Sequence, residues 1–263
     1  MPSIRFLRRS ERLWKARHTH RHARLRLWRR RRAFRLRRWE HHRRHRPRGH
    51  PLRAKWWRLY REAVRHVARW TRLRNRASAM LARRRRQLLE RGARRPRIVR
   101  LETRARGRFG AIGPLRAVTG HYTAGPADRD DADALRLFRD IDAAHHAQWG
   151  DGIGYHYGIA RSGTLVLLRP TGWRGAGVDG VNTGNVHVVC HGTTGTRPTA
   201  LQAGTLRWLH RNAHRRAMPA SHRVRTRLAG LRALGHTDWP APGGATACPG
   251  GFTRMYRTRG RER

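Results

Sequence analysis

Hydrophobic positions in the first third of the chain recur at steps of three and four residues. Residues 54–70 read AKWWRLYREAVRHVARW, with apolar side chains on one stripe and arginine on the opposite side. The stripe continues towards residue 90 and consists of Trp56, Tyr60, Val64, Val67, Trp70, Leu73, Ala77, Met80 and Leu81. Such spacing predicts an amphipathic helix over 54–90. Residues 5–46 show a similar mixture and also predict a helix, and RPRGHP at 46–51 separates the two.

From about residue 111 the pattern changes to short alternating or continuous apolar runs. Strands are expected at 115–125, in a hairpin at 154–170 and at 185–192. Helices are expected at 128–150, which starts with acidic residues, and at 199–214, where Thr199 and Gln202 have capping-box spacing. This order predicts an α/β fold: a central mixed β-sheet with flanking helices, preceded by a basic α-helical N-terminal region.

The charge divides the chain at nearly the same place. Residues 1–100 carry 38 Lys and Arg against 4 acidic residues, whereas residues 101–263 carry 24 against 11. The first segment therefore has a net charge of +34 out of the total of +47. We expect an Arg- and Trp-rich helical basic region at 1–100, a globular domain at 101–254 and a basic C-terminal tail at 255–263.

The basic region is expected to bind polyanions. Nearly all of its basic residues are Arg, which binds phosphate and carboxylate groups through paired hydrogen bonds. Arg and Trp on a basic helix suit an anionic membrane surface, an anionic cell-wall polymer or nucleic acid. No base-reading motif accompanies them, so nucleic-acid binding would be non-specific. One alternative is that the aromatic stripe only packs the two helices together. Separately, a GC-rich coding sequence would account for the excess of Arg over Lys.

Two cysteines, Cys190 and Cys248, provide no disulfide framework. No stretch approaches the roughly 18 apolar residues that span a bilayer, so no transmembrane segment is expected. The N-terminus is basic and lacks an apolar core, so we expect synthesis in the cytoplasm without a recognisable secretory signal.

The segment GHTDWPAPGGATACPG at 235–250 holds a histidine and a cysteine at the two ends of a loop rich in Gly and Pro. Such a loop is rigid and forms neither a helix nor a regular strand. A third candidate ligand, His121, closes the first predicted strand of the domain. Two imidazoles and one thiolate suit zinc, and three protein ligands leave a fourth position for water, as in catalytic sites. The spacing of His236 and Cys248 matches no zinc finger, and a small buried cysteine is the simpler alternative.

Four segments in this order carry a family resemblance: HYTAGP, IGYHYGIARSGTL, NTGNVHVV and GHTDW followed by TACPG. Together they resemble the zinc-dependent N-acetylmuramoyl-L-alanine amidases, which include phage endolysin amidases and peptidoglycan recognition proteins. The resemblance covers roughly residues 112–252 and implies that 101–254 is a zinc amidase domain. It implies Zn2+ as cofactor, with His121, His236 and Cys248 as ligands and Tyr155 and Thr246 as catalytic residues. Some branches have a catalytic Glu where this chain has Val189, so one candidate general base is missing.

The resemblance implies hydrolysis of the amide bond between the lactyl group of N-acetylmuramic acid and L-alanine of the stem peptide, at the bacterial cell wall. A phage-type or bacterial lytic enzyme is the expected class, with residues 1–100 holding it to an anionic envelope. Two alternatives stay open. One is a non-catalytic peptidoglycan-binding module, and the other is a polyanion- or nucleic-acid-binding protein with an inactive amidase fold.

The long Gly-rich segment at 169–185 is expected to line the substrate groove through Trp173, Asn182 and Asn185. The remaining candidate residues have structural interpretations. His145 and His146 end a predicted helix and favour its dipole. A second metal site at His187, Cys190 and His191 is disfavoured, because the two histidines share a strand face that Cys190 does not. Core positions are expected for His156, Tyr157 and Cys190.

Overall fold

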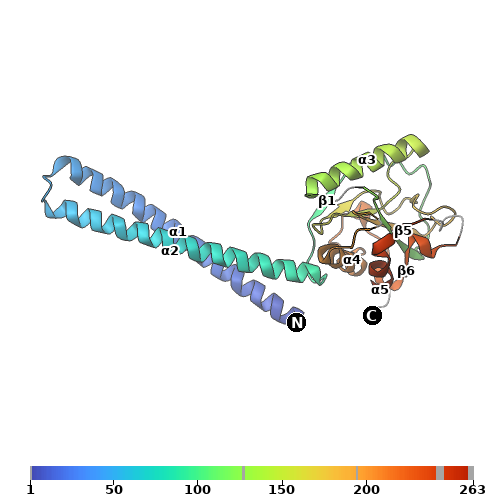
Figure 1. Cartoon of the computed structure of the whole chain (residues 1–263), viewed down its shortest axis with the longest axis horizontal. Coiled ribbons are helices and arrows are strands. Elements are labelled where there is room, and N and C mark those ends of the chain that lie inside the picture. The colour runs from blue at the N-terminus through green and yellow to red at the C-terminus, as the bar shows by residue number, and fades with distance from the viewer. Residues whose placement is uncertain (1, 126–127, 194, 241–245, 260–263) are drawn as a thin grey trace. The chain divides into compact units, whose positions relative to one another are not determined.

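The computed structural model describes residues 2–125, 128–193, 195–240 and 246–259. The chain forms two compact units, Met1–Gln87 and Leu88–Arg263 (Figure 1). The division lies before residue 100, where the composition changes. Leu88 is fully buried, and the backbone of Gly204 lies directly against Leu89. The residues after Gln87 therefore pack with the second unit.

The first unit is a helical hairpin of α1 (Ile4–His45) and α2 (Pro51–Glu90). Ser3 caps α1 by accepting a hydrogen bond from the Phe6 amide, and Pro51 occupies the first position of α2, where its missing N–H costs nothing. The two helices predicted from the spacing are confirmed. None of the described helices is long and apolar enough to cross a bilayer.

Aromatic contacts and hydrogen bonds hold the hairpin together more than a continuous apolar core does. In α1 the buried residues are Leu7 and Leu25. Trp28 stacks on His66 of α2 with ring centroids 3.8 Å apart. Arg35 donates to the Leu59 carbonyl and the Glu62 carboxylate across the hairpin, at 2.8 and 3.1 Å. The aromatic stripe therefore packs the helices together, although Phe6, Leu13, Phe34 and Trp57 are 40–51% exposed.

The second unit is built on one sheet with the strand order β1-β4-β3-β5-β2-β6. Its strands are β1 (Ile98–Arg100), β2 (Ala117–Tyr122), β3 (Tyr157–Ile159), β4 (Leu165–Leu167), β5 (Asn185–Cys190) and β6 (Arg232–Gly235). β3 and β4 form the predicted antiparallel hairpin, and the other neighbouring strands are parallel. The sheet is therefore mixed, as predicted.

Helices cover both faces of this sheet, with α3 (Asp131–Trp149) on one face and α4 (Ala200–Asn212) and α5 (Thr253–Arg259) on the other (Figure 1). Thr199 and Gln202 form the predicted capping box at the start of α4. Short 3-10 turns span Ala220–His222, Leu228–Gly230, His236–Asp238 and Gly250–Phe252. Met255 and Tyr256 of α5 are buried in the core, so the segment expected to be a tail from residue 255 begins inside a packed helix.

Strand β5, in the middle of the sheet, shows which side chains reach each face. Every residue of β5 is buried, as expected for a strand covered on both sides. Because side chains alternate along a strand, Val186, Val188 and Cys190 enter the core beneath α4 and α5. His187 and Val189 face the other way, towards α3, and this second face carries the chemistry.

Candidate metal centre

His121, His236 and Cys248 come together at one end of the sheet. Their ligand atoms all lie within 4.8 Å of one another. β2 and β6 are parallel neighbours with Gly120 opposite Gly235, so the histidine that follows each glycine emerges at the same edge. His121 is fully buried, whereas His236 and Cys248 are half-buried. Strand pairing therefore brings together two residues that are far apart in the sequence.

Backbone contacts hold Cys248 against this pair. The Thr237 amide donates to the Cys248 carbonyl at 3.0 Å, and the Tyr122 amide donates to its Sγ at 3.4 Å. Sγ lies 3.8 Å from Nδ1 of His121. Gly235 permits this approach, because a Cβ there would lie 2.9 Å from Cδ of Pro249. The thiol is thus positioned by β2 and by the turn that follows β6.

The chemistry of these residues fits zinc. In a tetrahedral zinc site with Zn–N near 2.0 Å and Zn–S near 2.3 Å, ligand atoms lie about 3.5 Å apart, close to the 3.8 Å between Nδ1 and Sγ. Burial holds the pKa of His121 well below its usual value, so its imidazole is neutral and offers a lone pair. Burial also raises the pKa of Cys248 to about 11, so a cation that binds the sulfur must displace its proton.

Tyr155 and Thr246 line a cleft of about 930 Å³ together with His236. The Tyr155 ring lies 4.9 Å from the His121 ring. Burial, with the nearby Cys248 sulfur, raises the pKa of Tyr155, so the phenol keeps its proton. Thr246 is exposed, and its Oγ1 accepts a hydrogen bond from the Cys248 amide at 3.2 Å. The cleft thus contains two hydroxyl groups near the candidate ligands.

The residues expected to line the substrate groove are not all in this cleft. Asn182 lines it, but its Oδ1 accepts hydrogen bonds from the amides of Gly177 and Val178 and holds the loop in shape. Trp173 and Asn185 are not among the described residues that line the cleft. Asn185 is buried, and its Oδ1 accepts a hydrogen bond from Thr119.

An aromatic wall that the sequence did not reveal completes the cleft. Phe109 and Trp149 both line it, with ring centroids 6.4 Å apart. His145, one helical turn before Trp149, lies 4.4 Å from the Trp149 ring and 5.6 Å from the Tyr155 ring. Its Nδ1 accepts a hydrogen bond from the Gly154 amide, a role different from the helix-dipole contact expected for it. The spacing of four between His145 and Trp149 was the available sequence signal.

A buried ion pair supports the loop that carries Phe109. Arg169 and Asp151 are both fully buried, with Nη1 and Oδ2 3.0 Å apart. Asp151 also accepts hydrogen bonds from the amides of Arg106 and Arg108, and the Arg169 guanidinium lies 4.8 Å from the centre of the Phe109 ring. One buried pair thereby orders the segment before β2 that borders the cleft.

His187 and His191 do not share a site. Nδ1 of His187 lies 3.1 Å from Nε2 of His121. His191 instead contacts Asp128, with Nδ1 and Oδ1 3.1 Å apart.

Comparison with known protein families assigns the chain to a family. The sequence pattern of the family described as N-acetylmuramoyl-L-alanine amidase matches residues 112–251. No curated protein sequence matches the chain. Among solved structures, the chain is similar to Drosophila peptidoglycan recognition protein SD, at 23% identity over 59% of this chain and 89% of that chain, with a TM-score of 0.47.

Two further structures extend this comparison. The N-acetylmuramoyl-L-alanine amidase LysC from Clostridium intestinale is 22% identical over 59% of this chain and 89% of that chain, with a TM-score of 0.43. Peptidoglycan recognition protein LE in complex with tracheal cytotoxin is 22% identical over 61% of this chain and 91% of that chain, with a TM-score of 0.48. Since the family match spans more than half of the sequence, the chain belongs to the N-acetylmuramoyl-L-alanine amidase family.

Proposed function

We propose that the protein is a zinc-dependent amidase that hydrolyses peptidoglycan between the lactyl group of N-acetylmuramic acid and L-alanine of the stem peptide. The observation that carries this proposal is the cluster of His121, His236 and Cys248 beside a cleft lined by Tyr155 and Thr246. Membership of the family supports the reaction class. With this substrate the protein acts at the bacterial cell wall.

Amide hydrolysis needs an activated water and stabilisation of the charge that develops on the carbonyl oxygen. His121, His236 and Cys248 would hold zinc, which would act as a Lewis acid and lower the pKa of a water molecule to about 7. The neutral phenol of Tyr155 donates a hydrogen bond towards a carbonyl oxygen in the cleft. The Thr246 hydroxyl accepts from the Cys248 amide and keeps its own hydrogen free to donate as well.

Some branches of the family have a Glu that helps catalysis at the position that Val189 of β5 occupies here. Here the corresponding residue, Val189, is buried in the core beneath α3. Among the described residues that line the cleft, Asp179 is the one carboxylate, and its side chain is exposed. We assign no step to Asp179.

The proposal is tested by digesting purified peptidoglycan with the full chain and identifying the products by mass spectrometry. We expect new L-alanine amino termini and intact glycan strands. A zinc chelator should abolish cleavage and added zinc should restore it. A folded, zinc-loaded protein that binds peptidoglycan without cleaving it would instead support the non-catalytic binding module.

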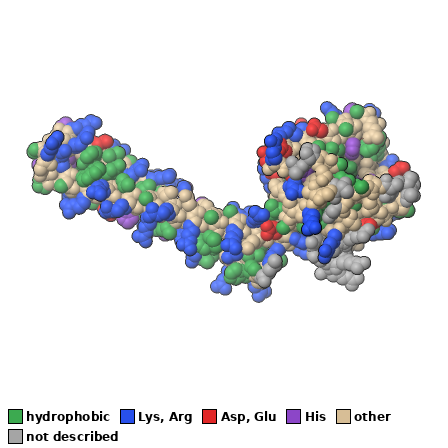
Figure 2. Space-filling model, viewed as in Figure 1, with side chains coloured by type: hydrophobic (Ala, Val, Ile, Leu, Met, Phe, Trp, Pro, Cys, Tyr) green, Lys and Arg blue, Asp and Glu red, His purple; other side chains and the backbone are tan. Residues whose placement is uncertain are grey.

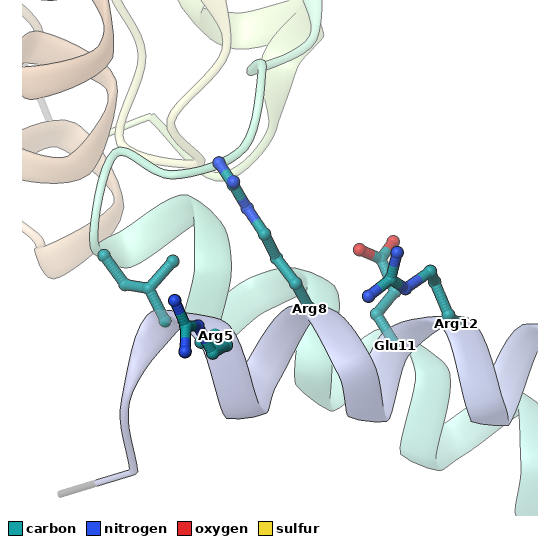
Figure 3. A pocket seen from close by; sticks show the side chains of 5 residues that line it. Arg5, Arg8, Glu11 and Arg12 are labelled. Carbon is teal, nitrogen blue, oxygen red and sulfur yellow. The ribbon is translucent and has the colours of Figure 1, made fainter.

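The helical hairpin is proposed to hold the enzyme to an anionic envelope surface. Residues 1–90 carry 33 Lys and Arg against 4 acidic residues, a net charge of +29, and basic side chains spread along the visible face of the hairpin with hydrophobic patches between them (Figure 2). Near its N-terminus α1 lines a pocket with three arginines and one acidic residue (Figure 3). The lining residues are Ile4, Arg5, Arg8, Glu11 and Arg12. Basic groups interleaved with exposed apolar ones suit an interface that is charged outside and apolar within.

Vesicle binding separates this targeting function from nucleic-acid binding. We expect the full chain to bind vesicles with phosphatidylglycerol far more strongly than neutral vesicles, and added salt should weaken the binding. Binding that does not respond to lipid charge or salt would contradict the proposal. Strong, salt-dependent DNA binding without cleavage of peptidoglycan would favour the nucleic-acid alternative.

A further inference from the structure

The imidazole of His121 has a different neighbour at each nitrogen. Nδ1 faces Sγ of Cys248 at 3.8 Å, within the candidate metal site. Nε2 faces away from that site, 3.1 Å from Nδ1 of His187. Both histidines are fully buried, so no bulk water reaches between them. The contact between the two imidazoles therefore decides which nitrogen of His121 carries hydrogen.

Counting hydrogens gives two arrangements for the pair of neutral rings. In one, His121 carries its hydrogen on Nε2 and donates it to His187, which leaves Nδ1 of His121 with a free lone pair. In the other, His187 donates to Nε2, so His121 carries its hydrogen on Nδ1, against the Cys248 sulfur. Only the first arrangement lets Nδ1 of His121 bind a metal ion, because a ligating nitrogen must be unprotonated.

The position of the His187 ring is fixed by its surroundings. Its amide donates to Nδ1 of His156, and its carbonyl accepts from the His156 amide, both at 3.0 Å. The loop above the ring approaches it at two glycines. A Cβ at Gly175 or at Gly177 would lie 2.5 Å from atoms of the His187 ring. The loop therefore packs closely against the ring in the orientation that places its Nδ1 beside Nε2 of His121.

The other nitrogen of His187 makes this arrangement costly. Nε2 is buried and has no hydrogen-bond partner among the residues that the structure describes. A buried polar atom without a partner destabilises a folded protein. An apolar residue at position 187 would avoid this cost but would leave the N–H of His121 without an acceptor. Among the described residues, the contact with His121 is the one hydrogen bond that the His187 side chain makes.

We propose that His187 is a positioning residue that accepts the Nε2 hydrogen of His121 and so holds Nδ1 ready for zinc. The inference rests on the proposed zinc site and adds a residue that orients one of its ligands, His121, through a hydrogen bond. Ligand histidines in metal sites generally donate their second N–H to a fixed acceptor, and loss of that acceptor weakens metal binding about 10- to 100-fold. Here the acceptor is an imidazole rather than a carboxylate or a carbonyl.

The test compares zinc dissociation constants of full-length variants by competition with a chromogenic chelator. His187→Leu removes the acceptor, and His187→Asn restores one, because the Asn Oδ1 lies near the position of His Nδ1. We expect zinc binding about 10- to 100-fold weaker in His187→Leu and within about threefold of the parent in His187→Asn. His222→Leu, which changes a buried histidine outside the site, should leave zinc affinity unchanged.

The outcomes separate the inference from the proposed function. If the parent protein binds no zinc, the proposed zinc amidase is wrong and the inference falls with it. If the parent binds zinc and His187→Leu binds it equally well, only the role of His187 is wrong. Thermal unfolding of each variant in the presence of chelator shows whether a loss of zinc affinity merely reflects a less stable fold.

A second measurement needs no variant and decides the matter if His187→Leu does not fold. In the zinc-loaded protein, 15N NMR should show His121 protonated at Nε2 and a coupling across the hydrogen bond to Nδ1 of His187. A His121 protonated at Nδ1, or no coupling to His187, would overturn the proposal.

Discussion

Arginine serves opposite purposes in the two units of this chain. In the hairpin, arginines lie on the surface and over aromatic rings, as the exposed Arg31 does at 4.9 Å from the Trp28 ring centre. In the second unit, Arg169 is completely buried and paired with Asp151. The first arrangement leaves charge available to a partner, whereas the second uses one charge to fix a loop beside the cleft.

The difference follows from what each unit can bury. Within α1 only Leu7 and Leu25 are buried among the described side chains, so the hairpin depends on stacking and on hydrogen bonds across its surface. The second unit has two apolar clusters, one on each face of the sheet. Such a core can compensate for a buried ion pair, and it also gives the candidate metal ligands a rigid support. We therefore expect substitutions in the second unit to affect catalysis and stability, and substitutions in the hairpin to affect surface binding.

The largest expected effect comes from replacing Cys248, a proposed zinc ligand. We expect Cys248→Ser to lower the rate of peptidoglycan cleavage by more than about a hundredfold, because removing a ligand should cost more than removing its supporting contact. Release of L-alanine amino termini and zinc content are the measurements. The matched control is Cys190→Ala, because Cys190 is a buried core thiol on the opposite face of the sheet. Equal losses in both variants would mean that Cys248 has only a structural role.

The next largest effect concerns the buried pair of Arg169 and Asp151. Asp151→Asn leaves a guanidinium buried without its counter-charge, and we expect the free energy of unfolding to fall by about 3–5 kcal/mol. Asp133→Asn is the control, since its partners Arg129 and Arg136 are both mostly exposed, and the expected loss there is below about 1 kcal/mol. Urea unfolding of the full chain gives both values. Similar losses at the two sites would contradict the importance of the buried pair.

The same pair predicts the dependence of stability on pH. Burial alone would raise the pKa of Asp151, but the Arg106 amide and the Arg169 guanidinium hold that pKa below its usual value. A carboxyl with a lowered pKa in the folded state stabilises that state above its unfolded pKa of about 3.9. This stabilisation is lost as the pH falls through the folded pKa. We expect the loss in acid to be smaller in Asp151→Asn, measured as the free energy of unfolding between pH 3 and 7.

Local periodicity was sufficient to predict most elements of the fold. Side-chain spacing and capping residues predict both long helices, α3, α4, the β3–β4 hairpin and the strands β2 and β5. β3 and β4 are equally short, but the Arg-Ser-Gly turn between them indicated a hairpin. β1 and β6 were missed because each is only three or four residues long and has no such turn beside it, and β6 reads Arg-Ala-Leu-Gly. α5 was missed because its two core residues, Met255 and Tyr256, stand among arginines in a segment that resembles a charged tail.

The candidate site was likewise predictable only in part. The chemistry of His121, His236 and Cys248 was visible in the sequence, but their proximity depends on the pairing of β2 with β6, a strand that was not predicted. Phe109 could not be assigned because the groups that orient its loop, Asp151 and Arg169, lie more than 40 residues further along the chain. Residue types thus indicate which chemistry is available, whereas non-local contacts decide which residues share the cleft.

A smaller effect is expected from removing exposed charge from the hairpin. The variant replaces four exposed arginines of α1 with Gln: Arg26, Arg29, Arg30 and Arg37. Each basic group near an anionic surface contributes about 1 kcal/mol, and only some of the four can face one plane, so vesicle binding should weaken about 10- to 100-fold. The control replaces four exposed arginines of the second unit: Arg139, Arg216, Arg225 and Arg227. Equal weakening would show that total charge, and not the hairpin, determines binding.

The smallest effect tests whether stacking replaces a core in the hairpin. Trp28 stacks on His66 with an interplanar angle of 7°, yet it remains partly exposed. We expect Trp28→Ala to cost about 1 kcal/mol, because an aromatic contact at a half-exposed site contributes about that much. Phe138→Ala is the matched change in the second unit, where the ring is fully buried against Gly158, and there we expect a loss of about 3–5 kcal/mol.

Hydrogen exchange in the full chain assigns each loss to its own unit, because amides of α1 and of β5 report separately. If Trp28→Ala cost as much as Phe138→Ala, the hairpin would have a cooperative core of its own. Its aromatic residues would then be structural, and its arginines alone would remain available to an anionic partner.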